Sequence, residues 1–225
     1  MMSRWLPDIF FGYGYPILNY YSLFFFYVGA GLSFFLGNPV LGLNLALVLV
    51  HLASGMGMFW LTSRMWGRAS GIIAAIVYLY APFHLYEIYY RGACAEFTAY
   101  LFLPLLILAV REVALTGSAR WGAGVVLSLT GLILSHNIMA AVGTSIALIY
   151  GCFVIIFATR ERQRSFLVLG ASFVLAIGLT AFFWMPIVFE HSYVMLSRLV
   201  GGGFDYSQHF LSFQEILGGW GGWGA

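Results

Sequence analysis

Charge is scarce in this chain, because Asp, Glu, Lys and Arg make up only 8% of its 225 residues whereas soluble domains carry about 25%. Lysine is absent altogether, so all ten basic residues are arginine. The net charge of +2 is too small and too scattered to indicate a nucleic-acid surface, and we expect no nucleic-acid partner. With 62% hydrophobic residues, 19% aromatic residues and a mean hydropathy of +0.92, the composition predicts a polytopic membrane protein.

Several sequence signals of soluble chemistry are also missing. The two cysteines, Cys94 and Cys152, fall at different predicted membrane depths, so we expect no bridge between them. The sequence has no P-loop, no Gly-x-Gly-x-x-Gly turn, no paired-cysteine motif and no His-Glu-x-x-His, which argues against a nucleotide-driven pump and a zinc peptidase. No cofactor is evident; the acidic residues leave room for a divalent cation, although no spacing predicts its ligands.

Apolar runs fill most of the chain from residue 20 onward. A spanning helix needs about 20 apolar residues, and about 17 suffice when it tilts or the bilayer thins. The runs predicted to span are residues 40–61, 69–83, 97–110, 121–135, 138–158 and 165–187. Residues 20–36 would form a helix of only about 24 Å against a core of about 30 Å. We interpret them as an outer juxtamembrane helix, with a short tilted span as the alternative.

These runs predict an all-α, polytopic helical membrane protein in three parts. Residues 1–39 form an outer aromatic and glycine-rich segment with the juxtamembrane helix, and residues 40–187 form a six-helix transmembrane bundle. Residues 188–225 form an outer loop region. The chain stops in a stretch of glycine and tryptophan that suits neither a helix cap nor a span, so we expect a truncated loop region and a fragment of a longer protein.

Three connections between the predicted helices carry arginine. They contain Arg64 and Arg68, Arg111 and Arg120, and Arg160, Arg162 and Arg164. Cytoplasmic loops carry an excess of arginine, and two helices separate each connection from the next, so all three can lie inside together. This topology places residues 84–96, the turn 135–137 and everything after residue 189 on the outer side.

The densest polar group falls in the first of these outer segments and contains His84, Glu87, Arg91 and Glu96. If the segment is helical, offsets of three and four place His84, Glu87 and Arg91 on one face. An acid, a base and a cation would then lie together; the alternative is an interfacial salt bridge within an aromatic belt. Glu96 is drawn toward the apolar region, where an ionisable group is usually functional. Pro104 should free backbone groups that need partners from neighbouring helices.

Four other places carry candidate residues, each with two interpretations. His136 at the outer mouth is a proton carrier or phosphate contact, or lies in a turn whose Ser135 and Asn137 cap helices. Glu190 faces the same cavity or marks the membrane boundary. Tyr13 and Tyr15, among glycines, suit stacking on a sugar or bedding in the lipid interface. His51, mid-helix, is expected to be a hydrogen-bonded buried histidine.

Four stretches of the chain form a recognisable pattern. They are residues 4–22, residues 81–97 with Arg91-Gly92-Ala93 and Glu96, residues 134–137, and Phe204-Asp205-Tyr206 followed by His209-Phe210. Together they resemble the bacterial 6-pyruvoyl-tetrahydropterin synthase-related membrane domain, which is in turn similar to the GT-C superfamily of polyprenyl-phosphate-sugar glycosyltransferases. The Arg64 to Arg68 connection is similar to an inner loop of that superfamily. Pterin chemistry itself is rejected, because the histidines are dispersed rather than clustered around a zinc site.

The resemblance implies a glycosyltransferase of the inner or plasma membrane. Its donor would be a polyprenyl-phosphate-linked sugar and its acceptor a glycan or another molecule on the outer face, with the lipid bilayer as its surroundings. Glu96 or Glu87 would be the catalytic acid or base, and Arg91 and His136 would bind the donor phosphate. Sugar or lipid contacts are expected from Tyr13, Tyr15, His84 and Glu190.

The chain departs from the GT-C pattern at its start. In that superfamily a carboxylate just after the first spanning helix serves as base, but this sequence contains neither that helix nor that motif, and Asp8 does not occupy the base position. The alternative function is therefore a non-catalytic membrane lipid-binding or transport component, or an inactive fragment.

Overall fold

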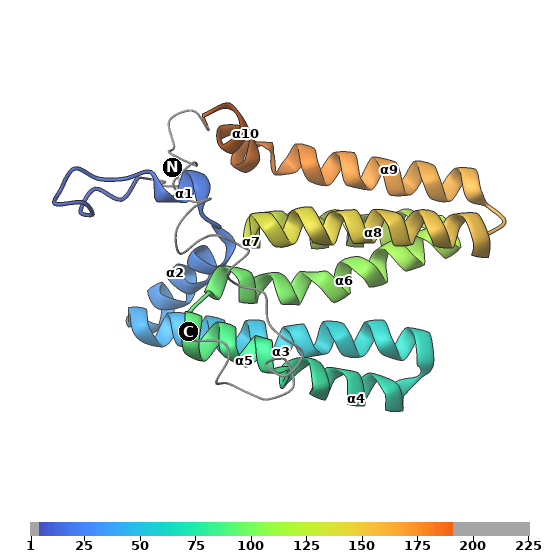
Figure 1. Ribbon diagram of the computed structural model, residues 1–225, viewed down its shortest axis with the longest axis horizontal. Helices are drawn as coiled ribbons and strands as arrows, with labels where there is room; N and C mark the ends of the chain where they lie inside the picture. Colours follow the sequence, from blue (N-terminus) through green and yellow to red (C-terminus); the bar gives the residue numbers. More distant parts are fainter. Residues whose placement is uncertain (1–4, 191–225) are drawn as a thin grey trace, which may run out of the picture. The chain divides into compact units, whose positions relative to one another are not determined.

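The computed structural model describes residues 5–190, which form helices and connections without a strand (Figure 1). In chain order the elements are α1 (Ile17–Tyr20), α2 (Phe24–Leu36), α3 (Pro39–Trp66), α4 (Arg68–Leu79), α5 (Pro82–Tyr86), the π-helical turn η1 (Glu87–Arg91), α6 (Cys94–Thr116), α7 (Ala119–Ser135), α8 (Asn137–Ala158), α9 (Arg162–Leu179) and α10 (Ala181–Phe189). The chain divides into two units, Met1–Phe183 and Trp184–Ala225, and the description below concerns the first. Of the outer loop region expected at residues 188–225, everything after residue 190 lies outside the described residues.

The predicted class is confirmed: the chain is an all-α, polytopic membrane protein. Within the described residues, five helical stretches are long and apolar enough to cross a membrane, namely Pro39–Trp66, Arg68–Arg91, Cys94–Thr116, Asn137–Ala158 and Arg162–Leu179. The shorter α7 has 17 residues, about 25 Å of helix. Large apolar side chains stand exposed on these helices, including Ile73, Leu127, Ile149, Phe157 and Val174. In a membrane these side chains meet lipid.

Helix α6 is the most buried of the long helices and packs against α3, α7, α8 and α9. Its Leu106, Val110 and Val113 are fully buried in the main apolar core, together with Leu129 of α7 and Ile155 of α8. The turn η1 directly precedes α6 and contacts it. The start of α6 and η1 are therefore held by the most buried long helix of the unit.

The three arginine-bearing connections lie at one end of the first unit, as predicted. The Arg64 Cζ atom, near the end of α3, is 5.9 Å from the centroid of the Trp121 ring, near the start of α7, so the α3–α4 and α6–α7 connections lie at the same end. A Cβ atom on Gly117 would lie 3.0 Å from Arg164 Cγ, which brings the α8–α9 connection to the same place. Figure 1 shows the α3–α4 and α8–α9 turns at one end and α2 and α5 toward the other. We call this arginine end inner and the opposite end outer.

The second predicted span continues well beyond residue 83. α4 ends at Leu79, and the chain resumes at Pro82, whose missing N–H is tolerated at the first position of α5. Together with η1 these helices form the 24-residue stretch Arg68–Arg91. Of the segment 84–96 expected on the outer side, only Gly92 and Ala93 lie between helices, so its polar residues sit at the ends of two spans rather than in a loop.

The last predicted span, residues 165–187, is interrupted at Thr180. The Thr180 Oγ1 hydroxyl donates to the Ala176 carbonyl at 2.9 Å and to the Ile177 carbonyl at 3.1 Å. A hydroxyl that bonds back to the preceding turn bends a helix, and α9 ends at Leu179 while α10 starts at Ala181. The span is therefore α9, which begins three residues earlier than predicted.

Helix α2 lies at the outer end. The Leu23 N–H, just before α2, donates to the Leu134 carbonyl in the last turn of α7 at 3.1 Å. This hydrogen bond joins the start of α2 to the end of α7. α2 ends at Gly37, beside Asn38, whose Oδ1 accepts from Leu41 N–H at 3.1 Å and caps α3. Both ends of this 13-residue helix, about 20 Å long, thus lie at one end of the unit, and its juxtamembrane position stays a prediction.

Pro104 lies inside α6, as its sequence position predicts, and a neighbouring helix supplies the missing partner. A proline removes the N–H that would bond to the carbonyl four residues earlier, which here belongs to Tyr100. The Tyr78 hydroxyl of α4 donates to that carbonyl at 2.9 Å. The expected need for a partner from another helix is confirmed, and this bond ties α4 to α6 near the outer end.

Replacing Tyr78 by phenylalanine should lower the unfolding free energy by about 1–2 kcal/mol, because the Tyr100 carbonyl is left unpaired in apolar surroundings. In a Pro104→Ala background the restored amide of residue 104 supplies the partner, so the same substitution should cost much less. A double-mutant cycle measured by unfolding in detergent checks this. Equal costs in the two backgrounds would show that the Tyr78 bond does not compensate for the proline.

Candidate functional site

Three charged side chains meet where the second and third spans join at the outer end. Arg91 Nη1 donates to Glu87 Oε1 and, at 3.2 Å, to Glu96 Oε2. The Glu87 side chain is fully buried, that of Glu96 is 17% exposed and that of Arg91 is 45% exposed. With both carboxylates ionised, this group, which we call the Arg91 cluster, carries one net negative charge. The structure thus joins three of the predicted site residues.

The local backbone explains how the cluster forms. Residues 87–91 form a π-helical turn, which the Gly92 N–H closes by donating to the Glu87 carbonyl, and the Ala93 N–H donates to the same carbonyl at 2.9 Å; such turns are often found at functional sites. Gly92 adopts a left-handed conformation with φ of 60°, which reverses the chain into α6. Glu96 consequently lies in the first turn of α6, where the helix dipole stabilises a carboxylate.

His136 lies close enough to the Arg91 cluster for its charges to act on the imidazole. Burial lowers the pKa of His136, with Glu96 opposing the shift and Arg91 adding to it. His136 Nδ1 accepts from the Met139 N–H at 3.2 Å and caps α8. The cap is therefore His136 and not Ser135, whose hydroxyl bonds to Gly131. Because Nδ1 is an acceptor, a neutral His136 keeps its Nε2–H for another partner.

Tyr21 is a residue of this region that the sequence did not single out. Burial raises the pKa of its phenol, and Cys94 and Glu96 act in the same direction while Arg91 opposes them. Tyr21 precedes α2, far from the cluster in sequence. The docking of α2 on α7 brings it there, and no periodicity or motif could have indicated that contact.

The His84 side chain is buried in the bundle and takes no part in the hydrogen bonds of the Arg91 cluster. Its ring stacks on Tyr100 with centroids 4.0 Å apart and meets the edge of Tyr78 at 4.5 Å. The expected common face of His84, Glu87 and Arg91 is thus only partly formed. Three buried polar atoms of this region have no hydrogen-bond partner among the described residues: His84 Nδ1, Glu87 Oε2 and Tyr100 Oη.

His51 belongs to the same aromatic layer, where it stacks on Phe97 with a centroid distance of 5.7 Å. Its Nδ1 is buried without a hydrogen-bond partner among the described residues, so the expectation of a fully hydrogen-bonded histidine was wrong for this atom.

The remaining sequence candidates lie in other settings. Tyr13 and Tyr15 belong to a turn in which Leu6 and Tyr15 exchange backbone hydrogen bonds of 3.0 Å, and Tyr13 is 85% exposed. Neither is joined to the Arg91 cluster by a hydrogen bond within residues 5–190. Glu190 belongs to the second unit, where its N–H donates to the Pro186 carbonyl at 2.8 Å.

An apolar pocket of about 310 Å³ lies beside the turn 135–137 that joins α7 to α8. It lies between α2 and α7 next to the Leu23–Leu134 contact, and its lining residues are Leu23, Phe24, Tyr27, Val28, Leu134 and Phe182. Leu134 is two residues from His136 in the chain, so the pocket lies next to the turn that contains His136.

The described part of the chain contains no group of three or more His, Cys, Asp or Glu side chains arranged to hold a metal ion. Glu87 and Glu96 already share the Arg91 guanidinium, which supplies the positive charge between them. Cys94 and Cys152 are free thiols.

The His136 cap predicts a pH-dependent stability. Because its folded pKa lies below 6.5, the unfolded chain binds the proton more readily. The contribution of neutral His136 to the unfolding free energy is therefore complete above about pH 6.5, and it is lost as pH falls toward the pKa of the folded state. His136→Ala should cost about 1 kcal/mol at pH 8, whereas His136→Asn should retain the cap and lose the pH dependence. Unfolding measured from pH 5 to 8 checks this; parallel curves for wild type and His136→Asn would contradict it.

Residues 18–199 match the family model of the 6-pyruvoyl-tetrahydropterin synthase related domain, a membrane protein family. No curated protein and no solved structure matches the chain. Since the match covers most of the sequence, the chain belongs to this membrane protein family.

Proposed function

We propose that this chain is a GT-C-like membrane glycosyltransferase that takes its sugar from a lipid-phosphate-linked donor at the outer face of the plasma membrane. The proposal depends above all on one observation, the half-exposed Arg91 held by a fully buried Glu87 and a partly exposed Glu96. Family membership supports a membrane setting, and the position opposite the arginine end supports the outer side.

The side chains take distinct roles in this proposal. Arg91 binds the donor phosphate with guanidinium N–H groups, since its planar fork matches phosphate oxygens. Glu87 is a positioning residue, because it is buried and fixes Arg91 from below the surface. His136 donates its Nε2–H to the phosphate while Nδ1 remains in the α8 cap.

Glu96 is the proposed general base, because it is held less closely than Glu87 and is accessible. It takes the proton of the acceptor hydroxyl as that oxygen attacks the anomeric carbon of the sugar. The bond between the anomeric carbon and the phosphate oxygen breaks, and polyprenyl phosphate leaves with the electron pair. Arg91 stabilises the charge that develops on the leaving phosphate.

The apolar pocket beside the outer turn suits the tail of such a donor. The lipid tail would lie between α2 and α7. The phosphate at the end of that tail would then lie near His136. Tyr13 and Tyr15, exposed on the turn that precedes α1, remain the proposed sugar contacts. Glu190 and His84 remain proposed secondary contacts with the sugar or the lipid.

A second candidate function is a non-catalytic lipid-binding or transport component. One observation favours it: Arg91 is already paired with two carboxylates, so the cluster also has the chemistry of a structural ion pair that joins two spans. In that case the donor lipid would bind without transfer.

Transfer from a labelled polyprenyl-phosphate sugar, measured in membranes that contain the full-length protein, tests the proposal. We expect transfer by the wild type and its loss in Arg91→Ala and in Glu96→Gln. Unchanged transfer in both variants would remove the site. Saturable donor binding without transfer by any form of the protein would favour the second candidate.

A further inference from the structure

A cavity of about 620 Å³ lies near the inner end, between α3, α6 and α7. Its walls include Trp60, Phe102, Leu105, Trp121 and Leu127, and its volume falls within the roughly 300–1,000 Å³ of ligand sites. Along α6, the lining residue nearest to Glu96 is Phe102, six residues or about 9 Å away, and none of Glu87, Arg91 and Glu96 lines the cavity. The cavity is therefore separate from the Arg91 cluster, and the inference below does not depend on the proposed function.

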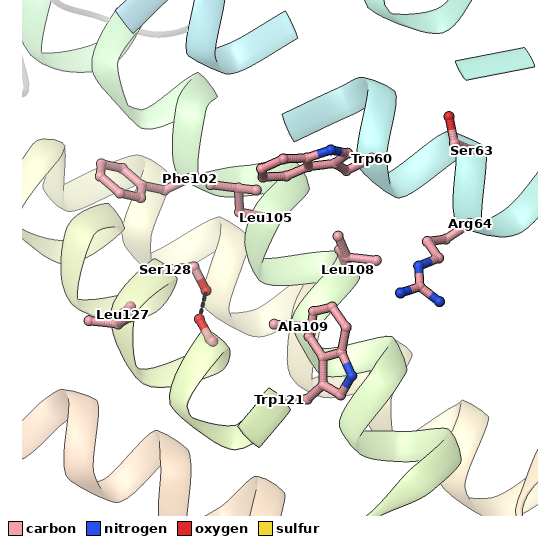
Figure 2. A pocket seen from close by; sticks show the side chains of 11 residues that line it. Trp60, Ser63, Arg64, Phe102, Leu105, Leu108, Ala109, Trp121, Leu127 and Ser128 are labelled. Carbon is pink, nitrogen blue, oxygen red and sulfur yellow. Dashed lines mark hydrogen bonds between the residues drawn. The ribbon is translucent and has the colours of Figure 1, made fainter. Parts of the chain in front are cut away.

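Arg64 supplies the only charged side chain of the cavity lining. Figure 2 shows its guanidinium turned toward the Trp121 indole, at a Cζ to centroid distance of 5.9 Å. Within residues 5–190 Arg64 has no acidic partner, in contrast to Arg111, which pairs with Glu112 at 2.8 Å, and Arg164, which is 3.9 Å from Glu161. Its charge is thus available to an anionic ligand.

The hydroxyls of the lining are already used or turned away. Ser128 Oγ donates to the Gly124 carbonyl at 2.7 Å, as the dashed line in Figure 2 shows. Ser63 Oγ faces Gly71 of α4, where an added Cβ would lie 2.0 Å from it, and Figure 2 shows Ser63 pointing away from the cavity. The cavity therefore offers one cation and an apolar wall, which suits an amphiphile with a single anionic group.

The cavity also faces the bilayer. Leu127 is 72% exposed and Trp60 is 53% exposed, so its rim is open on the side that meets lipid. Trp60 lies near the end of α3 and Trp121 near the start of α7, and tryptophan near the end of a span is typical of the boundary between headgroups and acyl chains. The inner end carries the arginine-bearing connections, and the cytoplasmic leaflet is the one that carries anionic lipid.

We propose that this cavity binds an anionic glycerophospholipid of the cytoplasmic leaflet. Arg64 binds the phosphate at the membrane boundary, with Trp121 holding the guanidinium in place. One acyl chain lies along Leu108 and Leu105 toward Phe102 and Leu127. A zwitterionic lipid would fill the same apolar space, but the positive group of its headgroup would weaken its attraction to Arg64.

Fluorescence quenching by brominated lipids tests this proposal. The full-length protein is placed in phosphatidylcholine vesicles with an equal small fraction of brominated phosphatidylglycerol or brominated phosphatidylcholine. Subtracting the signal of a Trp60→Phe/Trp121→Phe variant isolates the quenching at the cavity. We expect about a fivefold preference for phosphatidylglycerol, as one basic residue near an anionic lipid predicts.

Two arginine variants complete the test. Arg64→Gln should abolish the preference while leaving overall quenching by acyl chains. Arg68→Gln, the matched control at the start of α4, removes an arginine of the same connection that does not line the cavity, and it should retain the preference. Equal quenching by the two lipids in the wild type, or a preference that survives Arg64→Gln, would overturn the proposal.

Discussion

Replacing Arg91 by alanine should lower the unfolding free energy by about 3 kcal/mol, the lower end of what breaking a buried ion pair costs. The lower end applies because the Arg91 side chain is 45% exposed and solvent screens part of its charge. The remaining cost arises because Glu87, which is fully buried, loses its cation. Unfolding in detergent measures the change, and donor binding measured on the same protein should be lost.

A double variant separates stability from function. Glu87→Gln/Arg91→Ala removes the uncompensated buried charge, so it should recover most of the stability lost in Arg91→Ala. It should not recover donor binding, because the phosphate contact is still absent. Recovery of both would assign Arg91 a purely structural role, and recovery of neither would show that Glu87 is not the source of the instability.

Glu96→Gln should reduce sugar transfer by about 10²- to 10⁴-fold, the usual contribution of a general base. The glutamine retains the shape of the side chain and can still accept a hydrogen bond from Arg91, so donor binding should stay close to that of the wild type. Transfer rates and donor binding are measured side by side in membranes of equal protein content. A proportional loss of both would assign Glu96 to binding rather than to proton transfer.

Glu112→Gln is the matched control for that substitution. Glu112 is also a carboxylate of α6 paired with an arginine, at 2.8 Å from Arg111, but it lies 16 residues from Glu96, about 24 Å along the helix. We expect its replacement to leave transfer unchanged. An equal loss of transfer in both variants would point to a general effect on α6.

The sequence predicted those features that local chemistry decides. Apolar runs indicated the long helices, although several of their ends differ from the prediction. Arginine indicated which helix ends lie together, and the offset of four residues between Glu87 and Arg91 indicated their ion pair. Pro104 indicated a carbonyl in need of a partner, because the loss of an N–H follows from the residue type alone.

The sequence could not predict features that depend on contacts between distant helices. It did not identify Tyr78 as the donor to Tyr100, because that choice follows from the packing of α4 on α6. The placement of Tyr21 near the Arg91 cluster depends on the docking of α2. Two local features were also not predicted: His136 caps α8 although serine and asparagine flank it, and the Thr180 hydroxyl bonds back to the preceding turn where α9 ends.

The most direct test of the account is the side of the membrane on which each end of the first unit lies. In a Cys94→Ser/Cys152→Ala background, single cysteines replace Ala93, beside the Arg91 cluster, or Ala119, at the arginine end. Treating intact cells with a membrane-impermeant thiol reagent should label the cysteine at position 93 at once and that at position 119 only after permeabilisation. The reverse pattern would place the proposed sugar-transfer site in the cytoplasm and the lipid cavity outside, and would contradict both proposals.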